Sequence, residues 1–341
     1  MSTPIEHDAP SDSSLATAYP QLSLAKRIRD RGWLVTYGAL WLAIGGWASL
    51  HPVAKGVVAI VGALQTTWSR ATVAAIVLIV LVLIARGPRV LLQELARHPE
   101  QLATYALLSF TLSSLMAMAA LQVLPANINA VLNNMGPLYL AIITAAFGHR
   151  ARAGMIVLGA LLAFGGVGLV VLPGATDANH LSLLAVGISG SSSIVIAIQA
   201  VYGRWMLRER DPLVATAISA GMAALGLSMF LPFFGGLSPV VEAPHPVQIA
   251  LLYLGTGATA LNFVCWSIAL QRLSAPQAML FQNFIPPLGV LLSALFLGEA
   301  LTPWLSLGVT LIVSSTMLAQ RSLPVRRQQA TSPSPERSLL T

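Results

Sequence analysis

The chain has 341 residues, of which 56% are hydrophobic and only 9% are charged. Soluble domains carry about 25% charged residues, so the composition excludes an ordinary soluble domain and indicates a membrane protein. The net charge of +7 would favour a nucleic-acid partner in a soluble protein. Here the positions of the charges fit membrane topology instead, and we expect no nucleic-acid partner.

Ten apolar segments of about 18 to 23 residues follow one another, each long enough to cross a hydrocarbon core about 30 Å thick. The predicted transmembrane helices cover 33–53, 68–85, 102–121, 127–147, 154–173, 182–203, 213–233, 247–269, 277–297 and 301–320. The start of the second helix is open, because the connection 54–69 is largely apolar and can extend the first helix. The flanking residues 1–32 and 322–341 are rich in Ser, Pro and charge, which predicts disordered tails.

Basic residues recur in alternate connections. With the N-terminus in the cytoplasm, the cytoplasmic connections and the two tails hold all but two of the 19 Lys and Arg. The two exceptions are Lys55 and Arg70, both near the first external connection. The positive-inside rule therefore predicts ten helices with both termini in the cytoplasm. Since no cleavable signal precedes the first helix, we expect a multi-pass protein of the cytoplasmic (inner) cell membrane.

The chain also carries a weak internal repeat. An offset of 150 residues pairs Asn133 with Asn283 and Pro137 with Pro287, and an offset of 149 places ALQVLPA over ALQRLSA. The shared order of these matches favours duplication, with one repeat at 33–173 and the other at 174–321. Five helices per repeat is an odd number, so the second repeat enters the membrane in the opposite direction. Inverted repeats are typical of secondary transporters that work by alternating access.

The close of the second repeat reads PPLGVLLSALFLGEALTPWLSLGVTLIVSS, with Pro287 ten residues before Leu297, followed by Gly298 and Glu299. This stretch resembles the end of an EamA repeat in the drug/metabolite transporter superfamily, and WASLHPVAKG followed by Arg70 is similar to the beginning of one. The first half departs from the pattern, because His149 stands where the family usually has an acid. The resemblance implies a ten-helix permease, with both termini inside and no cofactor, that moves small polar metabolites, often outward.

Prolines halfway along the fourth and ninth helices are candidate gating residues. Pro137, Pro286 and Pro287 each remove a backbone donor and free a carbonyl in the bilayer interior. Two interpretations stay open. The kinks let the two halves rock and expose polar backbone to a central cavity, or they are tolerated packing kinks.

Polar and aromatic side chains inside the helices are the candidate substrate-binding residues, since an amide that faces lipid leaves donors and acceptors unpaired. Asn133 and Asn283 form the strongest pair. The full set is Trp47, His51, Asn133, Ser191, Asn262, Trp266, Gln282 and Asn283. For each residue the alternative role is helix packing or hydrogen bonding between helices.

No Asp or Glu falls inside a predicted helix. Carboxylate relays commonly couple transport to protons, so their lack favours facilitated movement or coupling through His51 alone. We interpret Glu299, at the outer end of the ninth helix, as structural more than as a proton site. Arg70 either extends to the lipid headgroups or attracts a substrate carboxylate.

The sequence contains no phosphate loop, no zinc-binding pair and no hydrolase-type serine, so we predict a transporter without catalytic residues, metal or cofactor. The neutral amides, serines and indoles of the expected cavity favour an amino acid or a related metabolite, moved by export or facilitated diffusion. A drug or nucleobase exporter, a non-transporting receptor or assembly subunit, and an intramembrane enzyme remain as alternatives. The sequence leaves open whether the protein is a monomer or a homodimer.

Overall fold

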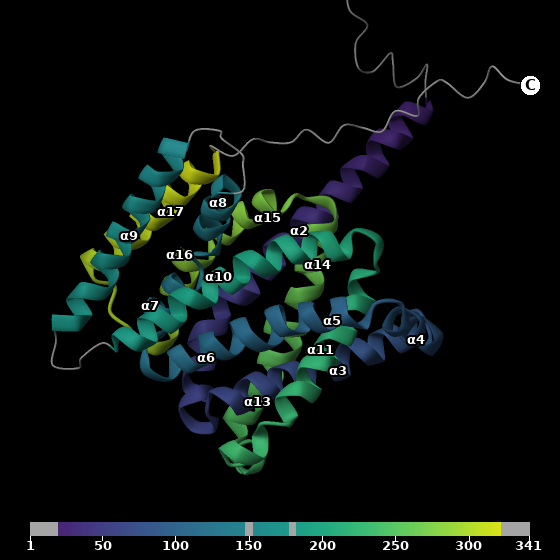
Figure 1. Cartoon of the computed structure of the whole chain (residues 1–341), viewed down its shortest axis with the longest axis horizontal. Helices are drawn as coiled ribbons and strands as arrows, with labels where there is room; N and C mark the ends of the chain where they lie inside the picture. The colour runs from purple at the N-terminus through teal and green to yellow at the C-terminus, as the bar shows by residue number, and fades with distance from the viewer. Residues whose placement is uncertain (1–19, 147–152, 177–181, 322–341) are drawn as a thin grey trace, which may run out of the picture.

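The computed structural model describes residues 20–146, 153–176 and 182–321, and every regular element in these ranges is a helix (Figure 1). Six helices are long and apolar enough to cross a membrane: Gly32–Val61, Ala63–Ala85, Pro99–Val123, Leu183–Glu209, His245–Arg272 and Gln277–Leu297. Leu158–Val170, Pro212–Ser228 and Pro303–Leu318 are shorter apolar helices. The all-α, multi-pass fold is therefore confirmed, whereas the count of ten spans and the orientation of the termini stay predictions.

The helices divide into two successive halves. The first half contains α2 (Pro20–Val61), α3 (Ala63–Ala85), α4 (Pro88–Arg97), α5 (Pro99–Ala106), η1 (Leu107–Leu112), α6 (Ser113–Val123), α7 (Ala126–Asn133), α8 (Gly136–Ala146) and α9 (Ala153–Thr176). The second half contains α10 (Leu183–Met206), η2 (Leu207–Glu209), α11 (Pro212–Ser228), η3 (Leu231–Phe234), α12 (Ser238–Val241), α13 (His245–Gly255), η4 (Thr256–Leu261), α14 (Asn262–Arg272), α15 (Ala275–Gln282), α16 (Ile285–Leu297) and α17 (Pro303–Arg321).

The predicted boundary before the second transmembrane helix is wrong. Only Gly62 separates α2 from α3, and it turns the chain with a φ of 90°, a conformation that suits glycine. The polar residues that follow are compatible with a helix, because the Thr66 and Thr67 hydroxyls donate to carbonyl oxygens four residues earlier. Arg70 therefore lies about 10 Å along α3 rather than at its beginning.

The two halves repeat the same irregularities 149 residues apart. η1 and η4 are π-helical turns that interrupt long helices at matching positions. The pairs α7 and α15, and α8 and α16, also begin at matching positions. This register aligns Asn133 with Gln282 and Asn134 with Asn283, one residue away from the pairing at an offset of 150. The internal repeat is thus visible in helix geometry as well as in sequence.

Helix breaks accompany the candidate gating prolines. α7 ends at Asn133 and α8 begins at Gly136, and the same gap separates α15 from α16. Pro137 and Pro286 lie in the first turn of the second helix, where the missing N–H removes no intrahelical hydrogen bond. Pro287 is the next residue of α16 and is exposed. The two segments are interrupted rather than bent as continuous helices.

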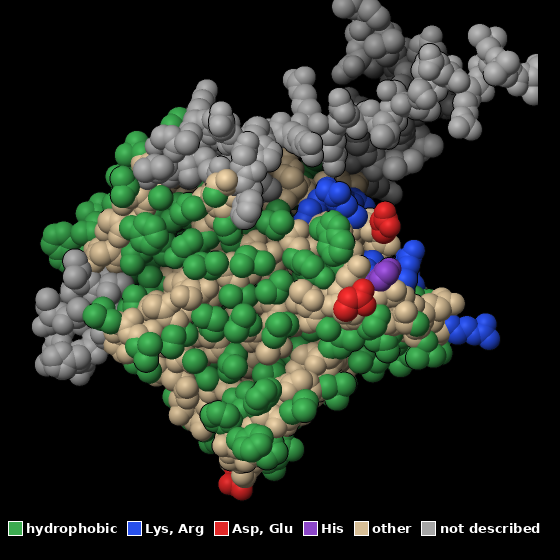
Figure 2. All heavy atoms as spheres, in the orientation of Figure 1, with side chains coloured by type: hydrophobic (Ala, Val, Ile, Leu, Met, Phe, Trp, Pro, Cys, Tyr) green, Lys and Arg blue, Asp and Glu red, His purple; other side chains and the backbone are tan. Residues whose placement is uncertain are grey.

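Close helix contacts hold the bundle together. α9 and α17 lie side by side at one edge, and α3 lies beside α11 (Figure 1). Gly166 of α9 and Gly308 of α17 allow these two helices to approach closely, since a Cβ on either glycine would come within 3 Å of the other's carbonyl oxygen. Large apolar side chains such as Ile84, Phe233 and Leu295 remain exposed on the sides, and Figure 2 shows hydrophobic side chains spread over the visible face. This exterior fits contact with lipid tails.

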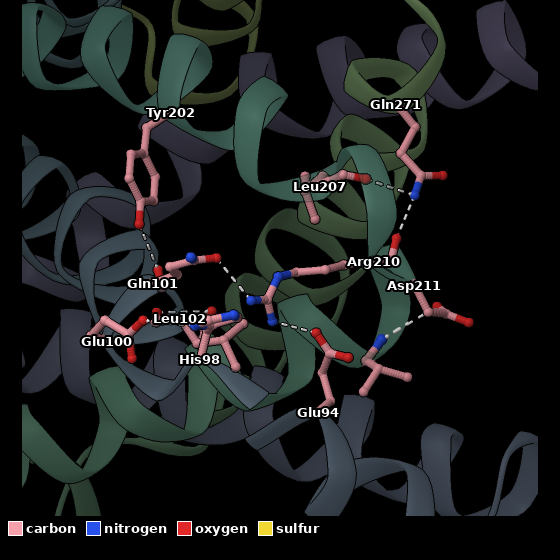
Figure 3. Close-up of polar contacts among 12 residues, drawn as sticks. Glu94, His98, Glu100, Gln101, Leu102, Tyr202, Leu207, Arg210, Asp211 and Gln271 are labelled. Carbon is pink, nitrogen blue, oxygen red and sulfur yellow. Dashed lines mark hydrogen bonds and ion pairs between the residues drawn. The ribbon is translucent and has the colours of Figure 1, made fainter. Parts of the chain in front are cut away.

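Basic side chains lie along the end of the bundle where α4 and the C-terminal ends of α10 and α14 are found (Figures 1 and 2). There Arg210 donates to Glu94 and to Gln101 Oε1 (2.8 Å). Gln271 donates to the carbonyl oxygens of Leu207 (3.0 Å) and Arg210 (2.5 Å) (Figure 3). The bonds of Arg210 join α4 and α5 of the first half to the residue that follows η2, and the bonds of Gln271 hold that segment to α14 within the second half. We refer to this end of the bundle as the arginine end.

Candidate functional site

A cavity of about 80 Å³, enough for several water molecules, lies between the two halves. Its lining comes from α2, α3, η1, α6 and α7 of the first half and from α10, α14 and α15 of the second half. Trp47, His51, Arg70, Asn133 and Gln282, all singled out from the sequence, contribute to this lining. The cavity therefore brings together residues that are far apart in the chain.

Cavity residues correspond between the two halves in the 149-residue register. Asn133 corresponds to Gln282, and Trp47 corresponds to Ile196. Leu50 corresponds to Gln199 in the same register. Leu50 belongs to α2 and Gln199 to α10, two helices in the middle of the bundle (Figure 1). The cavity thus lies where equivalent surfaces of the two repeats face each other, which is the place of the binding site in inverted-repeat transporters.

Other residues predicted for the site do not line this cavity. Trp266 is completely buried, with its ring 5.4 Å from that of Trp47. Asn262 is packed against Gly46 of α2. Asn283 donates to the carbonyl oxygen of Leu280 (3.0 Å) in its own helix.

The serine cluster of α10 points inward through residues other than the predicted Ser191, which is exposed. Ser189 donates to Asn129 Oδ1 (2.7 Å), Ser192 accepts from Asn133 Nδ2 (2.5 Å), and Ser193 donates to the carbonyl oxygen of Leu132 (2.6 Å). Residues 192 and 193 lie on the same side of the helix as residue 189 because they follow it by three and four positions. That spacing was the signal that could have identified them.

His51 is buried and belongs to a polar chain that crosses three helices. Its Nδ1 lies 3.1 Å from Asn129 Nδ2, and Asn129 Oδ1 accepts from Ser189. An amide nitrogen only donates, so Nδ1 is the acceptor in this arrangement. The imidazole is therefore held in a fixed orientation at the cavity wall between α2, α7 and α10.

Arg70 is also buried, with 4% of its surface exposed, and does not extend to the protein surface. Its Nε donates to Thr259 Oγ1 (3.1 Å), and that hydroxyl donates to the carbonyl oxygen of Leu254 (2.6 Å). The π-helical turn η4 places Thr259 in this position. Among the residues that the structure describes, no Asp or Glu forms an ion pair with Arg70.

Aromatic rings form the apolar wall of the cavity. Trp47 meets Phe263 edge to face, with ring centroids 5.7 Å apart, and Phe110 packs on Phe263 with centroids 4.3 Å apart. Such pairs stabilise packing beyond the area that they bury. The cavity therefore combines amides, hydroxyls and one guanidinium with a rigid apolar surface.

Glu299 lies away from the cavity and binds the corner between α6 and α7. Its carboxylate accepts from the backbone N–H groups of Ala126 and Asn127, both at 2.8 Å. Lys55 donates from the other side to the carbonyl oxygens of Leu121 and Leu124, both at 2.8 Å. We call this arrangement the Lys55–Glu299 bracket, and it joins the two halves at the end opposite to the arginine end.

Metal-binding geometry is not found in the described ranges, where no group of three or more His, Cys, Asp or Glu side chains comes together. The single cysteine, Cys265, is buried in α14. The described groups that the cavity offers to a ligand are therefore hydrogen-bond donors and acceptors, aromatic faces and one cation.

Comparisons with known proteins agree with this architecture. A probable terminal-alkyne amino-acid exporter of Streptantibioticus cattleyicolor is 25% identical over 308 residues, which cover 86% of this chain and 96% of that protein. The uncharacterized transporter YvbV of Bacillus subtilis is 22% identical over 284 residues, 83% of this chain and 91% of that protein. A solved crystal structure with 21% identity has a TM-score of 0.61 and covers 88% of this chain and 99% of its own, which shows a shared fold.

The pattern of one transporter family matches the chain twice, at residues 36–172 and 184–320. Each match takes in one of the two halves, so the family unit is the repeat itself. The two matches together cover more than half of the chain. The chain therefore belongs to the EamA-like transporter family, within the drug/metabolite transporter superfamily.

Proposed function

We propose that this transporter moves amino acids or closely related small polar metabolites across the cytoplasmic membrane by alternating access, as an exporter or a facilitated carrier. The cavity between the two repeats carries this proposal. Its amides and hydroxyls suit the polar groups of such a substrate, and the wall of Trp47 and Phe263 suits an apolar side chain.

The relative from Streptantibioticus cattleyicolor supports the substrate class, because its name describes an amino-acid exporter and the similarity extends over most of both chains. Within the cavity, Trp47, His51, Asn133 and Gln282 are the residues that we assign to substrate binding. Gln199, which corresponds to Leu50 in the other repeat, joins them.

Matching contacts at the two ends of the bundle support alternating access. Lys55 of α2 binds the carbonyl oxygen of Leu121, and Arg204 of α10 binds that of Leu270, which are equivalent positions in the two repeats. Each contact lies within one repeat, where it holds α2 to α6 or α10 to α14, so the two repeats carry the same contact at opposite ends of the bundle. The interruptions between α7 and α8 and between α15 and α16 allow the halves to rock around the cavity.

The arginine end lies in the cytoplasm in this proposal, since cytoplasmic connections carry an excess of Lys and Arg. The chain then crosses the membrane ten times, with both termini inside. No Asp or Glu is among the described residues that line the cavity. We therefore propose transport that is not driven by a carboxylate proton relay.

Reconstitution tests the proposal. Purified protein in liposomes is expected to give saturable flux of at least one member of a labelled amino-acid panel. Asn133→Ala and Trp47→Ala should reduce that flux at least about tenfold, as for loss of a polar and an aromatic contact worth more than about 1.4 kcal/mol each. Ser191→Ala is the matched control, because Ser191 belongs to the serine cluster but is exposed.

Different outcomes point to different functions. Normal flux in both cavity variants would remove this cavity as the substrate site. Flux of drugs or nucleobases without flux of amino acids would identify the alternative exporter. Saturable ligand binding without flux would identify a receptor.

A further inference from the structure

We infer that Arg70 is the binding site for a carboxylate group of the transported substrate, so the substrate is an anion or a zwitterion. This inference rests on the proposed function, because it identifies the chemical group that the same cavity recognises. It starts from a positive charge that is buried at the cavity wall, about 10 Å along a helix that is long and apolar enough to span a membrane.

The guanidinium is oriented but not neutralised. Within the described part of the chain, its one hydrogen bond runs from Nε to Thr259 Oγ1. Arginine has five N–H donors in a planar fork that matches the two oxygens of a carboxylate. The contact with Thr259 fixes the side chain through Nε and leaves the Nη groups to a ligand. Thr259 is itself fixed by its bond to the carbonyl oxygen of Leu254.

The surroundings of Arg70 supply no compensating charge. The cavity lining contains amides, hydroxyls, aromatic rings and His51, and no carboxylate is among the described lining residues. A charged side chain at this depth is costly unless it is paired or marks a binding path. A carboxylate that enters with the substrate would offset this cost during each transport cycle.

Comparison of the two repeats argues against a purely structural role. Arg70 is the eighth residue of α3, and its counterpart Ser219 is the eighth residue of α11. Ser219 is completely buried and donates to the carbonyl oxygen of Leu102 (3.1 Å). The repeated fold therefore accepts a small neutral side chain at this place. A cation occurs in one half only, which is the pattern expected for recognition of a single anionic group.

Acid and amide pairs test the inference without any mutation. The probes are the proteinogenic amino acids and the matching α-carboxamides, with sodium sulfate as an inorganic anion. Binding is measured as thermal stabilisation of the purified full-length protein in detergent, and flux is measured in liposomes. We expect at least one acid to bind about tenfold or more tightly than its amide, since hydrogen bonds to charged groups contribute about 1.5–3 kcal/mol each.

Variants then assign the effect to Arg70. Arg70→Gln should remove the preference for the acid over the amide, and Arg70→Lys should retain part of it because the charge remains. Arg89→Gln is the control, since Arg89 is exposed in α4, the helix that follows α3 in the chain. Circular dichroism and gel filtration establish that each variant is folded.

Each outcome separates this inference from the proposed function. Acid-specific binding that Arg70→Gln abolishes, without flux, supports the carboxylate site and overturns transport. Flux that is equal for acids and amides, or unchanged in Arg70→Gln, supports transport and overturns the carboxylate site. Equal stabilisation by sulfate identifies a general anion site and overturns the assignment to carboxylates. Neither binding nor flux of any probe overturns both.

Discussion

Replacing Glu299 by Gln should weaken the corner between α6 and α7, because the first two N–H groups of α7 have no local side-chain acceptor. Its N-cap residue, Pro125, has no side chain that can accept a hydrogen bond. The carboxylate of Glu299, two residues past the end of α16, accepts instead from the first two N–H groups of α7, both at 2.8 Å. A negative charge at this place also interacts favourably with the helix dipole.

The expected loss follows from these contacts. A glutamine keeps one acceptor oxygen, so the substitution removes one hydrogen bond to a charged acceptor, worth about 1.5–3 kcal/mol. Loss of the charge at the helix N-terminus adds about 0.3–1 kcal/mol. Glu299 is partly exposed, so screening by solvent reduces the sum, and we expect the free energy of unfolding to fall by about 2 kcal/mol.

Equilibrium unfolding in mixed detergent and SDS micelles, followed by circular dichroism, measures this change. Glu242→Gln is the matched control, because Glu242 is exposed and makes no side-chain hydrogen bond that the structure describes. Adding Pro125→Ser to the Glu299→Gln protein should recover about 1 kcal/mol, since Ser274 caps α15 at the equivalent position with a similar backbone conformation. A loss no larger than that of the control would refute the capping argument.

Two other predictions concern packing and coupling. Gly46→Ala should destabilise the protein by about 1–3 kcal/mol, because a Cβ at position 46 would lie 2.3 Å from the amide of Asn262. The control is Gly45→Ala, where a Cβ would have no atom within 4 Å, so the free energy of unfolding should change by less than about 0.5 kcal/mol. Equal losses would contradict that contact. Flux in liposomes should be indifferent to an imposed pH gradient, because no carboxylate is among the described cavity residues; a gradient requirement that disappears in His51→Gln would show coupling through His51.

Hydropathy accounts for the helices that the sequence predicts, since long apolar runs have few other ways to satisfy their backbone in a membrane. The repeated ALQ motif also indicated the internal repeat. The prolines predict kinks at the places where the structure instead interrupts the two helices. Inward-facing residues were harder to assign, because an apolar helix in lipid has no polar outer face to mark its orientation. For that reason the sequence does not distinguish Ser191 from Ser189 and Ser192, and the contacts with α7 decide between them.

Features that depend on contacts between distant segments could not be predicted. Burial of Arg70 depends on a hydroxyl 189 residues away, and the π-helical turn that presents this hydroxyl has no clear signal in the sequence. The sequence predicts a loop at the polar start of α3 for a related reason. The hydroxyls of Thr66 and Thr67 satisfy themselves within the helix, so their polarity does not require water.

The contact that Glu299 makes with the first repeat also follows from capping. In the second repeat Ser274 caps α15 and forms a reciprocal capping box with Gln277, so this helix is satisfied by its own residues. In the first repeat Pro125 stands at the place of Ser274, and the cap has to come from Glu299 of the other repeat. His149, which an offset of 150 residues pairs with Glu299, lies outside the described residues. Glu299 and Arg70 are both departures from the symmetry of the two repeats. Glu299 caps α7 of the other repeat, and Arg70 is the group to which we assign the substrate carboxylate.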